Sequence, residues 1–238
     1  MRLAIDTATD IASVAIGKPG RHPAARRIQG ARQHAAQILT LIQQVLADAG
    51  ATLCDLSEIV VGDGPGSFTG LRIGWAAAKG LAHEREIPLV AIPSLLGAAH
   101  GASEFERESR AIAACFDALR GQVFGAVYAF HPDRVETLVA PALFTLAELT
   151  RATSVRPALA VGDGAERYRV EVEAWTGKPP VPLDALPPIA GRLLRLADDA
   201  GARRPLDDVL AEPVYGRPAE AQVKWEASHG RALPHSSR

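Results

Sequence analysis

A glycine-rich run with two hydroxyl residues has the composition of a phosphate-binding loop. It covers residues 61–74, V-G-D-G-P-G-S-F-T-G-L-R-I-G, and lies between an apolar segment and a helical pattern. Glycines such as Gly64 and Gly66 permit positive φ angles and close backbone approach. Ser67 or Thr69 can cap the following helix, whose free N–H groups attract anions. The run therefore predicts either a phosphate loop or a well-capped turn between a buried strand and its helix.

The same run departs from the common catalytic motifs. A P-loop ends in Gly-Lys-Ser/Thr, whereas the next lysine here is Lys79, and the dinucleotide motif needs glycine where Ser67 or Thr69 stands. A serine nucleophile at position 67 would need glycine where Pro65 and Thr69 lie. Capping of the helix is therefore the favoured role of Ser67.

Two aspartates follow predicted strands and are candidate phosphate or metal contacts. Asp6 ends the first strand and precedes Thr7-Ala8-Thr9, a type of hairpin that actin-like and sugar-kinase-like ATPases wrap around phosphates. An Asx turn onto the Thr7 to Thr9 backbone explains Asp6 equally well. Asp117 has the corresponding place after a later strand and could line the same cleft. An ion pair with Arg120 or a turn cap would also account for it.

Metal and thiol chemistry have little support in this sequence. The seven histidines never fall four residues apart, as a helical metal pair would require: His22, His34, His83, His100, His131, His229 and His235. His34, beside Arg32, could be a base or an anion contact, but a partly exposed residue at a helix start is favoured. Cys54 and Cys115 lie in apolar contexts and are predicted to be buried free thiols in a reducing compartment. We expect no catalytic residue and no metal site.

Composition indicates a globular chain that does not bind RNA by itself. Of 238 residues, 47% are hydrophobic, which is enough for a substantial core, and the formal net charge is −1. A dense basic block, the electrostatic footprint of RNA binding, is missing. The sequence shows neither a signal-peptide pattern nor an apolar run of membrane-spanning length, so a cytoplasmic location is expected.

The order of predicted elements is that of an α/β protein with two lobes. Two short strands around a turn within residues 3–17 and a third strand at 24–29 precede a helix from Gln33 to Ala49. The apolar stripe of this helix is Ala35, Ile38, Leu39, Ile42, Val45, Leu46 and Ala49, with Leu41 off the stripe. A strand at 59–61, a helix at 68–84 and a strand at 89–92 complete a mixed sheet with helices against it.

A second unit follows the charged segment 104–110, a candidate hinge. It contains a strand at 111–116, a hairpin of 122–130 with 134–139, a short helix at 144–150, a strand at 158–161 and a helix at 189–200. Ala160-Val161-Gly162-Asp163-Gly164 repeats the pattern at 60–64. We expect an N-terminal lobe at 1–103, a smaller C-terminal lobe at 104–205, and a segment at 206–238 that returns toward the N-terminal lobe and has a frayed tail.

These motifs resemble one family closely. The A-I-D-T-A-T start, the run G-D-G-P-G-S-F-T-G-L-R-I-G, R-Q-H at 32–34, I-P-S-L at 92–95, D-A-L-R-G-Q-V at 117–123 and E-P-V-Y at 212–215 are similar to those of the TsaB (YeaZ) family. The resemblance covers nearly the whole chain, and the central loop is its most specific part. It implies a degenerate actin-like ATPase fold of two lobes, each with a mixed sheet flanked by helices and the second reduced.

The resemblance also implies a role. It indicates an accessory, non-catalytic subunit for tRNA N6-threonylcarbamoyladenosine modification that scaffolds the TsaD transferase and the TsaE ATPase, with tRNA contacted only through the complex. The metal-binding histidine pair of TsaD has no counterpart here. No cofactor is firmly implied, although ATP or ADP could bind at the complex interface. The alternatives are an actin-like ATPase or small-ligand phosphotransferase using Asp6 and the glycine loop, and a homodimeric binding module.

In the resembled family the two long helices of the first lobe form the interface with a second copy or with TsaD. Small residues along 68–84 would permit close helix approach, although packing on the chain's own sheet would suit them as well. The candidate interface residues are Ile38, Leu41, Ile42, Val45, Leu71, Gly74, Ala77, Ala78 and Leu81. The candidate nucleotide or phosphate contacts are Asp6, Thr7, Gly64, Gly66, Ser67 and Asp117.

Overall fold

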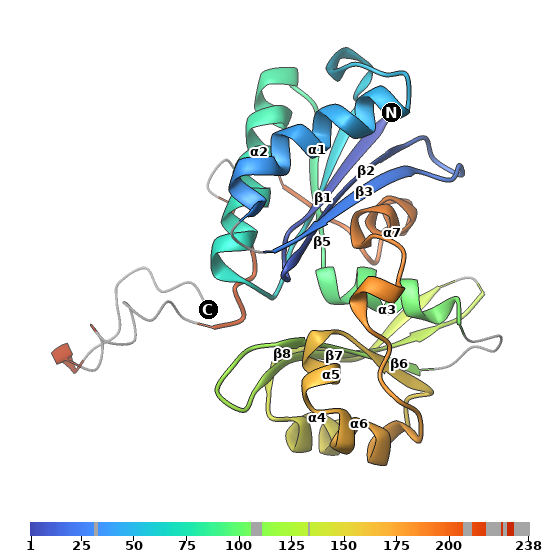
Figure 1. The fold of residues 1–238 in the computed structure, drawn as a ribbon, viewed down its shortest axis with the longest axis vertical. Coiled ribbons are helices and arrows are strands. Elements are labelled where there is room, and N and C mark those ends of the chain that lie inside the picture. The colour runs from blue at the N-terminus through green and yellow to red at the C-terminus, as the bar shows by residue number, and fades with distance from the viewer. Residues whose placement is uncertain are drawn as a thin grey trace.

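Two β-sheets, each with its own helices, make up the protein (Figure 1). The structure is a computed structural model that describes residues 1–30, 33–105, 111–132, 134–206, 211–217, 225 and 228–230. The predicted hinge at 104–110 and the tail beyond 217 therefore lie largely outside the described residues. Among the described residues, no helix is both long and apolar enough to span a membrane.

The first sheet has the strand order β10-β5-β4-β1-β2-β3. Its strands are β1 (Arg2–Asp6), β2 (Ile11–Gly17), β3 (Ala24–Gln29), β4 (Glu58–Gly62), β5 (Leu89–Ile92) and β10 (Arg204–Pro205). The first three form an antiparallel meander, whereas β4 and β5 run parallel to β1 and place their carboxyl ends at one edge. The central strands are buried on both faces, which explains their continuous apolar sequences.

Alternate residues of the central strands face two different cores. Leu3 and Ile5 pack under α1 (His34–Asp48) and α2 (Phe68–Arg85), whereas Ala4 faces α3 (Ser94–Ser103) and α7 (Ile189–Leu196). This is the period-2 alternation of a strand covered on both faces. The sheet thus carries two helices on each side.

The second sheet has the order β8-β7-β6-β9. Its strands are β6 (Ala111–Asp117), β7 (Val123–Phe130), β8 (Val135–Phe144) and β9 (Leu159–Val161). The helices α4 (Leu146–Ala152), α5 (Asp163–Arg167) and α6 (Arg169–Thr176) lie on the side away from the first sheet, and α3 packs against the other side (Figure 1). Two 3-10 turns, η2 (Leu53–Asp55) and η3 (Leu183–Ala185), complete the described elements.

Two elements of the 189–205 region pack on the first sheet although they follow the second one in sequence. Helix α7 contacts β1, β2 and α3, and β10 pairs with β5. A single cluster of buried residues therefore runs from the first sheet through α3 and α7 to the second sheet.

Every strand and helix predicted above is confirmed, although the first and last residues of several elements differ. The predicted buried face of α1 is partly wrong. On α1 the buried residues are His34, Ile38, Leu41, Ile42, Val45 and Leu46. The placement of Leu39 and Leu41 was therefore wrong, because Leu39 is 60% exposed and Leu41 is buried. Cys54 was also predicted buried and is exposed in the η2 turn, while Cys115 is buried as expected.

Candidate functional site

The Asp6 carboxylate lies at the carboxyl edge of the first sheet and is completely buried. Ser94 at the start of α3 donates a hydrogen bond from Oγ to Asp6 Oδ2 at 2.5 Å, and the Ala8 N–H lies 3.4 Å from Oδ1. Burial raises the pKa of Asp6 to about 6, and the bonds from Ser94 and Ala8 oppose this shift. The same carboxylate explains Gly62 on β4, where a Cβ atom would come within 2.0 Å of Asp6 Oδ2.

The glycine run leaves β4 and packs directly onto the Asp6 hairpin. Gly64 has φ +88°, and its N–H donates to Ser94 Oγ at 3.3 Å. Gly66 is required because a Cβ there would lie 2.2 Å from the Ala8 carbonyl oxygen. The Ser67 N–H donates to that same carbonyl at 2.7 Å. The predicted positive φ and close backbone contact are confirmed.

Ser67 is the N-cap of α2, as predicted. Its Oγ accepts a hydrogen bond from the Gly70 N–H at 3.2 Å, and Thr7 Oγ1 donates to the Gly70 carbonyl at 2.7 Å. Thr7 is 2% exposed, so the hairpin and the first turn of α2 are held together internally.

The arrangement of donors matches a packed turn better than a phosphate cradle. The N–H groups of Gly64, Ser67 and Gly70 all have partners within the chain. The loop also carries the carboxylate of Asp63, which accepts three hydrogen bonds from the Arg204 guanidinium, at 2.7, 2.9 and 3.2 Å. A phosphate here would have to displace backbone contacts and approach a buried negative charge.

Asp117 lies at the end of β6 and is bound to its own lobe. Its Oδ1 accepts from the Leu119 N–H at 3.0 Å, which confirms the turn-cap interpretation, and its Oδ2 pairs with Arg167 on α5 at 3.1 Å. Asp163 accepts from the Asp117 N–H at 3.1 Å. Among the described residues, no hydrogen bond or ion pair joins Asp117 to Asp6.

Most of the candidate interface residues face the interior of the chain. Residues that are buried in the chain do not line an open surface. Seven of the nine candidate interface residues on α1 and α2 are buried: Ile38, Leu41, Ile42, Val45, Leu71, Gly74 and Ala78. Gly74 illustrates the cause, since a Cβ there would lie 2.3 Å from Thr7 Oγ1. Only Ala77 and Leu81 of the predicted set are partly exposed.

His34 is another residue whose surroundings differ from the expectation. Its side chain is fully buried, with Nε2 3.2 Å from the Asp10 carbonyl oxygen, so the prediction of a partly exposed helix-start residue was wrong. Arg32 lies outside the described residues. Within the described part of the chain, no group of three or more His, Cys, Asp or Glu side chains is placed to hold a metal ion.

An aromatic cluster that the sequence did not reveal lies at the exposed start of α2. The rings of Phe68 and Tyr215 lie 4.7 Å apart, and Arg72 Cζ lies 4.1 Å from the Phe68 ring centroid. Arg72 also donates from Nε to the Tyr215 hydroxyl at 3.2 Å. Phe68 is 38% exposed. No local pattern predicted this contact, because residues 215 and 68 are far apart in sequence.

The first sheet, with an antiparallel meander, two parallel strands and helices on both faces, defines an actin-like ATPase fold, which the second lobe repeats in reduced form. A model of the family "TsaD: tRNA N6-adenosine threonylcarbamoyltransferase" matches residues 28–173. The TsaB protein of Bacillus subtilis is 30% identical over 94% of this chain and 96% of its own length. The chain belongs to the TsaB (YeaZ) family.

Other relatives agree with this assignment. The TsaB protein of Escherichia coli is 37% identical over 58% of this chain, and the alignment covers 62% of that protein's length. The alignment with the TsaB protein of Haemophilus influenzae covers 51% of that protein's length. The solved structure of YeaZ from Pseudomonas aeruginosa matches with a TM-score of 0.70 and 28% identity, over 90% of this chain and 99% of that one. The Escherichia coli, Haemophilus influenzae and Bacillus subtilis relatives carry the name "tRNA threonylcarbamoyladenosine biosynthesis protein TsaB".

Proposed function

We propose that this chain is an accessory subunit in tRNA N6-threonylcarbamoyladenosine biosynthesis that acts by binding partner proteins and does not itself catalyse the transfer. The kinship with TsaB proteins supports the pathway. The observation that carries the non-catalytic role is the closed hydrogen-bonding of the glycine loop onto the Asp6 hairpin. A TsaD-type transferase and a TsaE-type ATPase are the proposed partners, and tRNA would be contacted through the complex.

The Asp6 cluster is proposed to be a structural centre. It joins β1 through Asp6, β4 through Gly62 and α3 through Ser94. An ionised carboxylate at this site loses its hydration and is compensated by hydrogen bonds rather than by a paired cation. A buried, hydrogen-bonded carboxylate of this kind holds the three elements in one arrangement. Nucleotide turnover, by contrast, needs a phosphate-binding site that the nucleotide can reach. ATP or ADP, if it acts in the pathway, would then bind where this chain meets its partner.

The proposed docking surface is the outer face of α1 and α2, which pack against each other. Its proposed anchors are the Phe68, Arg72 and Tyr215 cluster together with the exposed side chain of Leu39. Aromatic residues and arginine dominate the energetics of protein interfaces. The proposed occupant is the TsaD-type partner, or a second copy of this chain in its absence.

Reconstitution of the modification reaction tests this proposal. Purified TsaD-type and TsaE-type partners, tRNA and the activated threonylcarbamoyl donor are combined with and without this chain, and modified adenosine is measured by mass spectrometry. Modification that requires the chain, together with background ATP turnover by the chain alone, is the expected result. Full modification without the chain would contradict the accessory role.

An enzymatic alternative has one observation in its favour, namely the buried carboxylate of Asp6 with its raised pKa. A carboxyl group of this kind is typical of catalytic acids and bases. ATP hydrolysis by the isolated chain that is abolished in Asp6→Asn would favour this alternative over the scaffold.

A further inference from the structure

The Arg72 guanidinium, on the exposed side of α2, is held in one orientation by two aromatic residues. Its Cζ lies 4.1 Å from the centroid of the Phe68 ring and 5.8 Å from that of the Tyr215 ring. Its Nε donates a hydrogen bond to the Tyr215 hydroxyl at 3.2 Å. The ring contacts and this bond restrict the guanidinium plane, which sets the direction of its two Nη groups.

Tyr215, which orients this guanidinium, is itself anchored to both lobes through its neighbours in sequence. The Val214 N–H donates to the carbonyl of Asp63 in the glycine loop at 2.9 Å. On the other side, Arg217 donates from Nη2 to Gln122 Oε1, just before β7, at 2.6 Å. The tyrosine therefore belongs to a segment that is fixed on each side of it.

The charge of Arg72 has no counter-ion in the part of the chain that the structure describes. Among the described residues, Arg72 forms no ion pair, and its one hydrogen bond is the one from Nε. Glu212 lies in the described segment before Tyr215, is exposed, and forms no ion pair with Arg72. Because the Arg72 side chain is exposed, its two Nη groups can bind a ligand.

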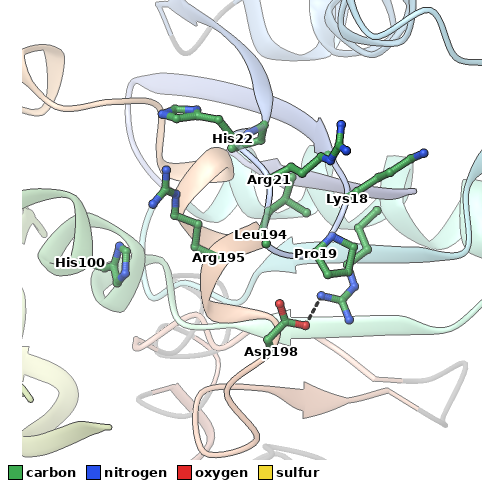
Figure 2. A pocket seen from close by; sticks show the side chains of 12 residues that line it. Lys18, Pro19, Arg21, His22, His100, Leu194, Arg195 and Asp198 are labelled. Carbon is green, nitrogen blue, oxygen red and sulfur yellow. Dashed lines mark hydrogen bonds and ion pairs between the residues drawn. The ribbon is translucent and has the colours of Figure 1, made fainter. Parts of the chain in front are cut away.

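Two other arginines of the first lobe are neutralised by carboxylates of the same chain. Figure 2, which looks into a hollow between the β2–β3 turn and α7, marks with a dashed line the ion pair of Asp198 with Arg2, at 2.5 Å. Arg26 on β3 pairs with Asp48 on α1, also at 2.5 Å. Arg72 is likewise at the surface, but the described residues provide it with no such carboxylate.

We propose that the two Nη groups of Arg72 bind a side-chain carboxylate of the TsaD-type partner in an end-on, bidentate ion pair. This inference rests on the proposed function, which places that partner on the outer face of α1 and α2. The guanidinium plane matches the two oxygens of a carboxylate, and such pairs are stronger than neutral hydrogen bonds. Because Phe68 and Tyr215 already restrict Arg72, less side-chain entropy is lost when the pair forms.

The surroundings of Arg72 favour a carboxylate in a protein interface over a nucleic-acid phosphate. Phe68, which the guanidinium contacts, is 38% exposed, and Val214, next to Tyr215 in sequence, is 45% exposed. A partner that covers these apolar side chains also excludes water from the ion pair, which strengthens it. RNA binding depends instead on several cations along an extended surface.

Calorimetric titration of the full chain with the purified TsaD-type protein tests the proposal. Arg72→Lys keeps the charge and removes the planar fork, so it should weaken binding about tenfold or more. Tyr215→Phe keeps the ring and removes the hydroxyl that holds Nε, and a smaller weakening is expected. The matched controls are Arg151→Lys on α4 and Tyr168→Phe before α6, which should bind at wild-type strength. Thermal unfolding checks the fold of each variant.

A cross-linking measurement identifies the chemical group that position 72 contacts. A carbodiimide condenses an amine with a neighbouring carboxylate to give an amide, and the carbodiimide is converted to a urea. The amine introduced by Arg72→Lys should therefore become joined to an aspartate or glutamate of the TsaD-type protein, as detected by mass spectrometry of the cross-linked peptides. The amine introduced by Arg151→Lys should not.

The possible outcomes separate this inference from the proposed function. Wild-type binding that Arg72→Lys leaves unchanged, or weakens no more than Arg151→Lys does, would overturn the inference and leave the proposed function standing. A failure of the carbodiimide to join position 72 to a partner carboxylate would do the same. Binding of tRNA to the chain alone that Arg72→Lys weakens would assign the guanidinium to phosphate instead. Absence of binding between the wild-type chain and the TsaD-type protein would overturn both.

Discussion

The Asp6 carboxyl group shows how burial decides the role of a residue that sequence alone leaves open. A phosphate contact and an Asx turn both fit the hairpin pattern, and a local hydrogen bond from the Ala8 N–H does form. The stronger partner is Ser94, which is 88 residues away in sequence and brought near by the parallel pairing of β1, β4 and β5. No local pattern could have revealed that contact.

The raised pKa of Asp6 predicts a specific pH dependence of stability. Its folded-state pKa of about 6 lies above the ordinary aspartate pKa of 3.8, so the native state binds the proton more tightly than the unfolded state does. The contribution of Asp6 to the free energy of unfolding is therefore present at low pH and is lost as pH rises from about 4 through 6. The loss is at most about 3 kcal/mol. Asp6→Asn should remove this decline, as measured by urea unfolding from pH 4 to pH 8.

A surface aspartate provides the control for that titration. Asp48 on α1 is hydrogen-bonded to Arg26, which lowers the pKa of Asp48, so its contribution is present at neutral pH and is lost as pH falls. Asp48→Asn should therefore change the pH profile in the opposite direction. An Asp6→Asn profile parallel to that of the wild type would show that Asp6 does not titrate as proposed.

At the scale of elements, the two long helices of the first lobe have distinct inner and outer faces. Gly74 and Leu71 pack against the hairpin and the sheet, so a bulky residue at 74 would disturb folding before it disturbed any assembly. The outer face carries Phe68 and Arg72. An interface test must use these outer positions.

Phe68→Ala/Arg72→Ala is predicted to weaken association with a second copy or with a TsaD-type partner by at least tenfold, because truncated aromatic and arginine anchors commonly cost more than about 1.4 kcal/mol of binding free energy. Sedimentation and calorimetric titration measure the effect. Arg169→Ala/Val170→Ala is the matched control, since it removes an exposed arginine and an exposed apolar side chain from α6. Unchanged association of a folded Phe68→Ala/Arg72→Ala variant would place the interface elsewhere.

Strands and long helices could be predicted because their patterns are local. The β4-loop-α2 unit follows from an apolar run, glycines and a serine cap, and all three are found. Helix α3 was not predicted because it is buried on nearly all sides, so its apolar residues show no helical periodicity. Which residues of α1 are buried depends on how the helix is rotated against the sheet, and the local sequence does not determine this rotation. Leu39 was for that reason placed on the buried face, although it is exposed.

At the scale of the whole molecule, the two sheets share one core. Helices α3 and α7 lie between the sheets, and the buried cluster includes Val60 of the first sheet and Phe116 of the second. Leu193 of α7 is fully buried at the centre of this arrangement, where a Cβ on Gly97 would lie 2.8 Å from Leu193 Cδ2. Such close packing joins the lobes through apolar contacts and not only through the connecting chain.

Leu193→Ala is therefore predicted to destabilise both lobes together, by about 2 to 5 kcal/mol, because it removes a buried side chain and leaves a cavity. Hydrogen exchange measured by mass spectrometry should show β1 and β4 losing protection along with β6 and β7. Leu53→Ala in the η2 turn, where the leucine is 39% exposed, serves as the control and should change stability by less than about 0.5 kcal/mol. If only the first sheet loses protection in Leu193→Ala, the lobes unfold independently and α7 belongs energetically to the first sheet alone.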